Sequence, residues 1–185
     1  QYHNMNYVFL ANGFEEIEAL APVDMMRRAG MEVTTVSINP SHEVTGAHGV
    51  TVLADALLAD IDPEQAEWLV CPGGMPGASN LAACEPLCDM LVRHHALGKK
   101  VAAICASPSI VFAPLGIIDS RNAVCYPSME DQGCGANWVD DMVVVDGNVV
   151  TAKGPAAACS FGFTIVAMSQ GIEAAEQVAH GMLLK

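Results

Sequence analysis

The sequence predicts one α/β domain, in which helices cover both faces of a mostly parallel β-sheet. Three observations support this fold class. Short strands alternate with helical segments along most of the 185 residues. The strands are apolar throughout, as expected where a sheet is buried on both faces. A chain of this length also buries about 70% of its unfolded surface, which is enough for a single core.

The first part of the chain has the pattern strand, helix, strand. Residues 5–11 (MNYVFLA) and 31–38 (MEVTTVSI) are predicted strands, because both runs are apolar or rich in β-branched residues. A helix is predicted over 15–28, since this segment begins with two glutamates and ends with two arginines, and Gly30 stops it. Pro22 lies inside this segment and predicts a kink or a restart of the helix.

The rest of the chain continues the alternation and adds a hairpin. Three further strands are predicted, at 50–54, 67–71 and 100–105. A helix over 79–97 joins the last two. In residues 142–152 (MVVVDGNVVTA), two β-branched runs flank an Asp-Gly pair, which indicates a hairpin. Two closing helices are predicted, at 155–169 and 172–184.

The charge balance excludes two classes of partner. The 21 acidic residues outnumber the 8 basic ones and give a formal net charge of -13, which repels nucleic acid and anionic membranes. Two charge-free runs, 101–118 and 154–172, are long enough to be considered as membrane spans. Both contain proline, glycine and serine where a strand, a turn and a buried helix would place them, and neither has flanking aromatic anchors. We interpret both as core and expect no membrane partner.

The cysteine content indicates a reducing environment. The seven cysteines are an odd number without paired spacing, and no cleavable signal segment is recognised before the first strand, so we expect a cytoplasmic protein. Residues 5–185 are predicted to form the domain, and residues 1–4 (QYHN) are interpreted as an expression remnant in front of it. The cysteines are at positions 71, 84, 88, 105, 125, 134 and 159.

Candidate chemistry gathers where predicted strands end. In an open parallel sheet, ligands bind at the carboxyl ends of the strands, and the strand over 100–104 leads directly into Cys105. A proline three residues later marks the start of a helix, whose unpaired N–H groups would favour a thiolate and lower the pKa of Cys105 from its ordinary value of about 8.5. Cys105 is therefore the candidate nucleophile. The alternative is a small buried apolar residue.

The ends of two other strands supply possible hydrogen-bond donors and a possible acid or base for the same site. Gly73 and Gly74 follow the strand over 67–71, and their N–H groups could stabilise an oxyanion; the alternative is a simple turn. Glu15, Glu16 and Glu18 follow the first strand and offer one acid or base to the same edge, although any of them could lie on a solvated helix face.

Other motifs favour packing over chemistry. Cys84 and Cys88 share a helix face, but no histidine or carboxylate completes a recognisable metal set. His94 and His95 are predicted to lie on the surface. The segment GGMPGAS lacks the Lys-Ser/Thr pair of a phosphate-binding loop. We expect neither a metal nor a cofactor.

Four segments carry a resemblance to a known family. They are FLANGFEEIEALAPVDMMRRAG, LVCPGGMPGASNL, VAAICASPSIVFAPLG and VTAKGPAAACSFGFTIV. Together, and in this order, they resemble the ThiJ/PfpI superfamily, which is class I glutamine amidotransferase-like. Specifically, they resemble the branch that contains the Parkinson-disease-linked protein deglycase and its bacterial relatives. The resemblance implies a flavodoxin-like three-layer α/β/α sandwich, a homodimer and activity without a cofactor.

The resemblance also implies roles for individual residues. Cys105 would be the nucleophile at a strand-to-helix elbow, Glu18 its protonated partner, and Gly73 and Gly74 amide donors. The peptidase branch has histidine directly after the cysteine; Ala106 stands there in this chain, which argues against a Cys-His protease. Tyr126 stands where the deglycase branch often has histidine, which leaves Glu18 to move the proton. Ala106 and Tyr126 are both expected beside the substrate.

Three functions follow from this interpretation. The first is a glyoxalase or deglycase that acts on a small aldehyde or dicarbonyl such as methylglyoxal. The alternative is an oxidative-stress sensor or chaperone that works through oxidation of Cys105. A third, an intracellular cysteine peptidase, is disfavoured by Ala106.

Overall fold

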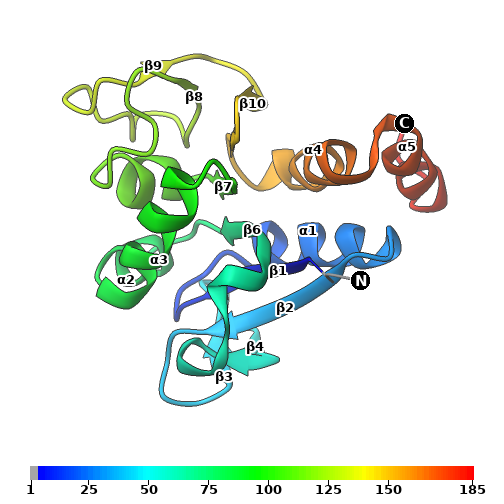
Figure 1. The fold of residues 1–185 in the computed structure, drawn as a ribbon, viewed down its shortest axis with the longest axis horizontal. Coiled ribbons are helices and arrows are strands. Elements are labelled where there is room, and N and C mark those ends of the chain that lie inside the picture. Colours follow the sequence, from blue (N-terminus) through cyan, green and yellow to red (C-terminus); the bar gives the residue numbers. More distant parts are fainter. Residues whose placement is uncertain (1–3) are drawn as a thin grey trace.

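A seven-stranded sheet forms the middle layer of the protein, which a computed structural model describes over residues 4–185 (Figure 1). Its strands are β1 (Met5–Leu10), β2 (Glu32–Ser37), β5 (Ala56–Leu57), β6 (Ala66–Cys71), β7 (Lys100–Ile104), β10 (Val143–Asp146) and β11 (Val149–Ala152). They lie in the order β10–β11–β7–β6–β1–β2–β5, and all neighbours are parallel except β10 and β11. The predicted class, a mostly parallel flavodoxin-like sandwich with a β-hairpin addition, is confirmed. Of the expected remnant, residues 1–3 lie outside the described part.

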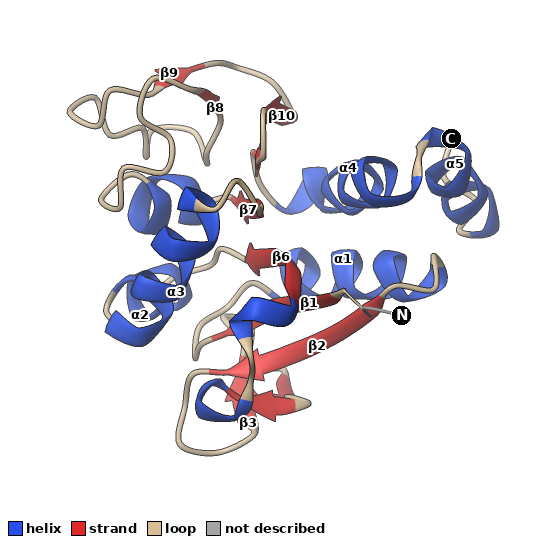
Figure 2. Ribbon diagram, in the orientation of Figure 1, coloured by secondary structure: helices blue, strands red, loops and turns tan. Residues whose placement is uncertain are grey.

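Helices cover both faces of the sheet (Figures 1 and 2). One face carries α1 (Glu16–Arg28), α4 (Ala158–Gln170) and α5 (Ile172–Gly181); the other carries α2 (Gly77–Ala82), α3 (Glu85–Ala96) and a π-helical turn at Pro108–Phe112. Alternate residues of β1 supply the two cores, because Val8 and Leu10 pack on the first face and Tyr7 and Phe9 on the second. Each fully buried side chain of this size contributes about 1.5–3 kcal/mol.

Helix α1 runs without interruption through Pro22, so the predicted restart is wrong. A proline inside a helix costs about 3 kcal/mol or more. That cost is offset because Pro22 lies on a buried face that packs tightly against α4. A Cβ added at Gly162 of α4 would come within 3.2 Å of Pro22 Cα and 2.7 Å of Met25 Sδ. The small residue in α4 therefore lets the two helices approach closely.

The single helix predicted over 79–97 is also wrong, because the segment forms α2 and α3 instead. Cys84 between them has extended backbone angles, and Pro86 lies in the first turn of α3. A continuous helix would have placed this proline in its interior, where it removes a hydrogen bond and clashes with the preceding turn. At the start of a new helix the missing N–H costs nothing.

Several short elements were not predicted. The strand expected at 50–54 forms as β4 (Thr51–Leu53), but it pairs antiparallel with β3 (Glu43–Thr45) outside the main sheet. The strands β3, β5, β8 (Asn122–Ala123) and β9 (Asn137–Trp138) have two or three residues each, too few for a periodic pattern. Short 3-10 turns occur at Leu58–Asp60, Pro63–Gln65 and Pro155–Ala157.

The two charge-free runs belong to the interior of the fold. Residues 101–118 form β7 and the turns that follow it, and residues 154–172 contain α4. Within residues 4–185, no helix combines the length and the apolar character that a membrane crossing requires.

The topology determines where a ligand can bind. The chain leaves β1 towards β2 on one side, whereas it leaves β6 towards β7 on the other. The loops after β1 and β6 therefore flank the point where the winding direction reverses, and such a point opens a crevice at the carboxyl edge of the sheet. Cys105 follows the next strand, β7, at the same edge.

His94 is a buried residue and not the predicted surface residue. Its side chain is 3% exposed, and Nε2 lies 3.1 Å from the carbonyl oxygens of both Glu67 and Lys100. Since both partners are acceptors, Nε2 carries a hydrogen and donates it. The ring thus ties α3 to the starts of β6 and β7. Burial is the main cause that lowers the pKa of His94 below its ordinary value.

This environment predicts a loss of stability in mild acid. The folded protein favours the neutral ring, so His94 contributes fully to the free energy of unfolding above about pH 6.5. This contribution is lost as the pH falls below that value, by up to about 1.4 kcal/mol per pH unit. His94→Gln keeps an N–H donor without the titration. We expect its free energy of unfolding to fall less than that of the wild type between pH 6.5 and 5, as measured by urea denaturation. His180→Gln on the exposed side of α5 is the control; equal losses in the wild type and His94→Gln would contradict the prediction.

Candidate active site

Glu18 is held in the first turn of α1. Its side chain is fully buried, and Oε1 accepts a hydrogen bond from the Gly73 N–H at 3.1 Å. The other oxygen, Oε2, has no hydrogen-bond partner among the described residues. Glu15 caps the same helix, because its Oε2 accepts from the Glu18 N–H at 2.8 Å. The first strand and this cap together fix the carboxyl of Glu18 in the interior.

The loop after β6 approaches so closely that only glycine fits. A Cβ at Gly73 would lie 2.7 Å from both Cys105 Cβ and Glu18 Oε1. Gly74 has a φ of +89°, and a Cβ there would lie 2.4 Å from the backbone nitrogen of Glu15. The two glycines bring the backbone against the sulfur, as predicted. They differ in function, however, because the N–H of Gly73 is already bonded to Glu18 and only that of Gly74 is directed to the sulfur.

Cys105 lies at a strained elbow directly after β7. Its φ is +64°, a left-handed value that costs a non-glycine residue about 1–3 kcal/mol. Neighbouring segments hold this conformation: the Cys105 N–H donates to Ala152 O at 2.9 Å, and Cys105 O accepts from the Tyr126 N–H at 2.8 Å. The residue is only 8% exposed. A reactant must therefore reach a sulfur that its neighbours largely cover.

Burial and a neighbouring carboxylate reverse the expected titration of Cys105. Its pKa is raised to about 12, first by burial and then by the charge and hydrogen bond of Glu18; the N–H groups of Gly74 and Ala106 act in the opposite direction. The prediction of a lowered pKa is wrong, because it considered only the helix start. The helix that follows is also a single π-helical turn at Pro108–Phe112.

Glu18 shows the complementary change, in the direction that the family resemblance implies. Its pKa is raised to about 7, mainly by burial; the hydrogen bond with Cys105 lowers it, and the charge of Glu15 raises it. Since the two groups interact strongly, they titrate as a pair. Between the two pKa values, about 7 and about 12, the pair therefore holds one proton.

The two remaining predicted site residues differ in their contacts. Ala106 presents its N–H to the sulfur of Cys105. The Tyr126 N–H donates to Cys105 O at 2.8 Å, whereas its side chain is half-exposed, and a Cβ added at Gly154 would lie 3.5 Å from its ring. The structure thus brings Cys105, Glu18, Gly73, Gly74 and Ala106 together, and Tyr126 adjoins them through its backbone.

A neighbouring cluster was not predicted. His48, on the turn between β3 and β4, places Nδ1 at 3.2 Å from Glu16 Oε1 and 3.8 Å from Glu15 Oε1. Potential metal-ligand atoms of these three residues lie within 4.8 Å of one another. Glu16 also accepts hydrogen bonds from the N–H groups of His48 and Val50, which fixes the turn on α1. Sequence reasoning could not place His48, because the β3–β4 hairpin had no recognisable signal.

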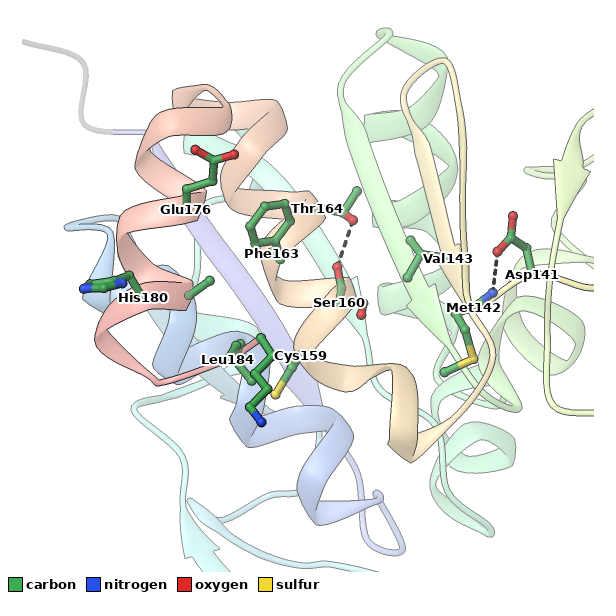
Figure 3. A pocket seen from close by; sticks show the side chains of 12 residues that line it. Asp141, Met142, Val143, Cys159, Ser160, Phe163, Thr164, Glu176, His180 and Leu184 are labelled. Carbon is green, nitrogen blue, oxygen red and sulfur yellow. Dashed lines mark hydrogen bonds between the residues drawn. The ribbon is translucent and has the colours of Figure 1, made fainter.

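Two other features lie away from Cys105. Cys88 donates its S–H to Leu81 O and Ala82 O, which agrees with a packing role. A cavity of about 700 Å³ opens between α4, α5 and the segment that leads into β10, where Met142, Phe163 and His180 line it (Figure 3).

These observations define a class of protein: a flavodoxin-like α/β domain with a buried cysteine–glutamate pair at the carboxyl edge of its sheet. Residues 6–168 match the DJ-1/PfpI family. The chain belongs to this family, as its resemblance had indicated.

Individual relatives agree with this assignment. The chain is 34% identical over 177 residues to protein DJ-1 homolog B of Arabidopsis thaliana, covering 95% of this chain and 40% of that protein. It likewise spans 45% of the Arabidopsis homolog A, so it matches less than half the length of these two relatives. The solved structure of oxidized Toxoplasma gondii DJ-1 is similar with a TM-score of 0.92 and 34% identity, covering 98% of both chains.

Some relatives have names that state an activity. A deglycase of Pyrococcus horikoshii is 34% identical over 155 residues, covering 82% of this chain and 92% of that protein. A glutathione-independent glyoxalase of Caenorhabditis elegans is 32% identical over 161 residues, covering 86% of this chain and 84% of that protein.

Proposed function

We propose that this protein is a cysteine-dependent glyoxalase or deglycase-like enzyme that acts on small reactive dicarbonyls such as methylglyoxal and needs no cofactor. The names of the Pyrococcus and Caenorhabditis relatives support an activity of this kind. The observation that carries the proposal is the pair of Cys105 and Glu18, which share a proton beside the N–H groups of Gly74 and Ala106. Such a pair supplies a nucleophile, a proton acceptor and an oxyanion site together.

The first step forms a bond between sulfur and carbon. Glu18 takes the thiol proton, and the Cys105 thiolate adds to the aldehyde carbon of methylglyoxal. The carbonyl electron pair moves to oxygen, where free backbone N–H groups stabilise the developing charge. Protonation of this oxygen by Glu18 gives a neutral hemithioacetal. The negative charge thus never leaves the small buried site.

The second stage moves a proton and adds water. Glu18 removes the hydrogen from the former aldehyde carbon, and the adjacent ketone gains a proton to give an enediol. Delivery of this proton to the former ketone carbon, with loss of the hydroxyl proton from the carbon bonded to sulfur, yields a 2-hydroxy thioester on Cys105. Water then cleaves the C–S bond and releases lactate and the free thiol. One methylglyoxal and one water give one lactic acid, with no net oxidation or reduction, so no external electron carrier is required.

Product analysis tests this function. Purified protein, incubated with methylglyoxal and a chelator but without glutathione, is expected to produce one lactate for each methylglyoxal consumed. Lactate is measured with a coupled dehydrogenase assay after the protein is removed. Loss of methylglyoxal without lactate would contradict the isomerising mechanism, because simple adduct formation on lysine or arginine consumes the substrate as well.

A second candidate is a sensor of peroxide through Cys105. A protonated Oε2 of Glu18, which has no partner among the described residues, and the N–H groups directed to the sulfur would donate hydrogen bonds to sulfinate oxygens. Two equivalents of peroxide would oxidise the thiol to sulfenic and then sulfinic acid, with water as the reduced product. Peptide mass spectrometry after mild peroxide treatment tests this. Sulfinate at Cys105 before the more exposed Cys84 and Cys159 supports the sensor, and the reverse order excludes it.

A homodimer is the proposed oligomeric state. Four large apolar side chains are exposed on the outer side of α1 and on β4 or just before it: Ile17, Leu20, Val50 and Leu53. Leu53 is 73% and Ile17 56% exposed. A second copy would bury this surface, since apolar patches of this kind mark interfaces.

Charge substitution tests the dimer. The wild type is expected to give twice the monomer mass of 19.4 kDa in light scattering at micromolar concentration. Leu53→Asp should give the monomer mass, because it places a charge in the proposed interface. The control is Leu183→Asp near the C-terminus, where the leucine is also exposed, at 86%, and this variant should stay dimeric. A wild-type monomer, or a Leu53→Asp dimer, would contradict the assignment.

A further inference from the structure

We propose that Glu15 makes the Cys105 site selective for uncharged reactants and excludes those that carry a carboxylate. The inference deepens the proposed function, since it concerns which carbonyl compounds reach the same sulfur. Its argument depends on the position of Glu15, on the charges around it and on the small size of the site.

Glu15 borders the glycine loop that contacts the sulfur. Its N–H donates to Gly73 O at 2.9 Å, and its carboxyl accepts from the Glu18 N–H at 2.8 Å. The residue is only 7% exposed, so water screens its charge poorly. Its charge also reaches the reacting pair, because it raises the pKa of Glu18. The negative charge of Glu15 would act in the same way on a reactant bound at Cys105.

The positive charges of α1 do not neutralise this end of the helix. Arg27 and Arg28 lie in its last turn and pair with Asp55 and Asp24. Within residues 4–185, no lysine or arginine forms an ion pair with Glu15, Glu16 or Glu18, and the only ionisable nitrogen that lies within 4 Å of the Glu15 and Glu16 carboxyl oxygens is Nδ1 of His48.

The physical consequence is repulsion of anions. The Glu15 carboxyl lies against the Glu18 N–H, beside a site where Cys105 is only 8% exposed, so a bound carboxylate would have to sit near like charge in a poorly screened environment. At an intermediate dielectric, repulsion between two unit charges slows a reaction by at least about tenfold. A neutral carbonyl of similar size meets no such barrier.

Two alkylating reagents measure this selectivity without relying on enzyme activity. Iodoacetamide is neutral and iodoacetate is anionic, and both attack the same thiolate, so the pKa of Cys105 cancels from the ratio of their rates. The rates at Cys105 are measured by peptide mass spectrometry at pH 8 and low salt, with 2-mercaptoethanol as the reference thiol. We expect the amide-to-acetate rate ratio at Cys105 to exceed the reference ratio by at least about tenfold. Salt should reduce the excess.

Glu15→Gln tests the residue itself. Glutamine keeps an oxygen that can accept from the Glu18 N–H, so the helix cap is retained while the charge is removed. The variant is expected to lower the rate ratio several-fold, whereas Glu173→Gln in the first turn of α5 should leave it unchanged. A wild-type ratio equal to the reference would overturn the proposal. A high ratio that Glu15→Gln leaves unchanged would overturn the assignment to Glu15.

Turnover then separates this inference from the proposed function. Methylglyoxal is compared with 4,5-dioxopentanoate, an α-oxoaldehyde that carries a carboxylate. Selectivity predicts a kcat/KM at least about tenfold higher for methylglyoxal, and a smaller difference in Glu15→Gln. If neither compound is converted, the proposed function fails while the alkylation ratios still decide the role of Glu15. Equal turnover of both compounds would overturn the selectivity alone.

Discussion

Cys105→Ala is expected to lower the conversion of methylglyoxal to lactate by at least about 10³-fold, to the level of the buffer. The thiol is the group that would form the C–S bond, and the other atoms near it, the N–H groups of Gly74 and Ala106, can stabilise a charge but cannot attack a carbon. The measurement is lactate production at saturating and at low methylglyoxal. Both kcat and kcat/KM should fall, because without the thiol no covalent intermediate forms.

The substitution should leave the fold intact. Alanine keeps the Cβ and meets the same left-handed backbone strain at φ +64° as cysteine does. Its melting temperature, measured by circular dichroism, is expected within a few degrees of the wild type. Cys159→Ala in α4 is the matched control and should retain full activity. A Cys105→Ala protein that is folded and keeps a tenth or more of the activity would exclude the proposed nucleophile.

Glu18→Gln is expected to lower kcat by about 10²–10⁴-fold, the usual contribution of a positioned acid or base. The amide oxygen can still accept from the Gly73 N–H, so the loop should keep its place. What the variant loses is the ability to take and return protons during the reaction. Full turnover by a folded Glu18→Gln protein would show that the carboxyl moves no proton.

The pH profile distinguishes this role from a structural one. With a pKa of about 7, Glu18 is protonated in acid and cannot accept the thiol proton. The wild-type kcat/KM is therefore expected to rise as the pH increases through about 7. Glu18→Gln should lack this rise. An identical pH dependence in the two proteins would contradict the assignment.

Alkylation of Cys105 by iodoacetamide reports the same interaction directly. Glu18 raises the pKa of the thiol through its charge, so Glu18→Gln should shift the alkylation midpoint to lower pH. Glu18→Leu also removes the charge but leaves no donor for the thiolate, and its midpoint should lie above that of Glu18→Gln. Three identical profiles would mean that Glu18 does not touch the sulfur.

Strong local patterns explain which parts of the fold were predictable. The apolar strands β1, β6 and β7 and the capped helix α1 each carry a periodic or terminal signal within their own residues. The break between α2 and α3 also has a local signal, because Pro86 is disfavoured inside a helix and suits the first turn of a new one. The hairpin of β3 and β4 had none, because three residues are too few to show a period.

In the candidate site, the positions of several residues could be predicted from the sequence, but their pKa values could not. Cys105, Gly73 and Gly74 could be named because each directly follows a strand, where parallel topology gathers ligands. The pKa of Cys105 could not be predicted from its neighbours in sequence. It depends on burial and on Glu18, 87 positions away in the numbering of the chain.

The sequence by itself determined the order of the main strands and helices, the mostly parallel sheet and the residues that follow its strands at the carboxyl edge. These properties depend on side-chain periodicity and on residue types, which are local. Only the tertiary structure decided which glycine N–H is free, how the proton is shared between Cys105 and Glu18, and that Glu15 lies beside them without a lysine or arginine partner in residues 4–185. The physical reason is that hydrogen-bond pairing, burial and electrostatic fields depend on distances between segments that are far apart in the chain.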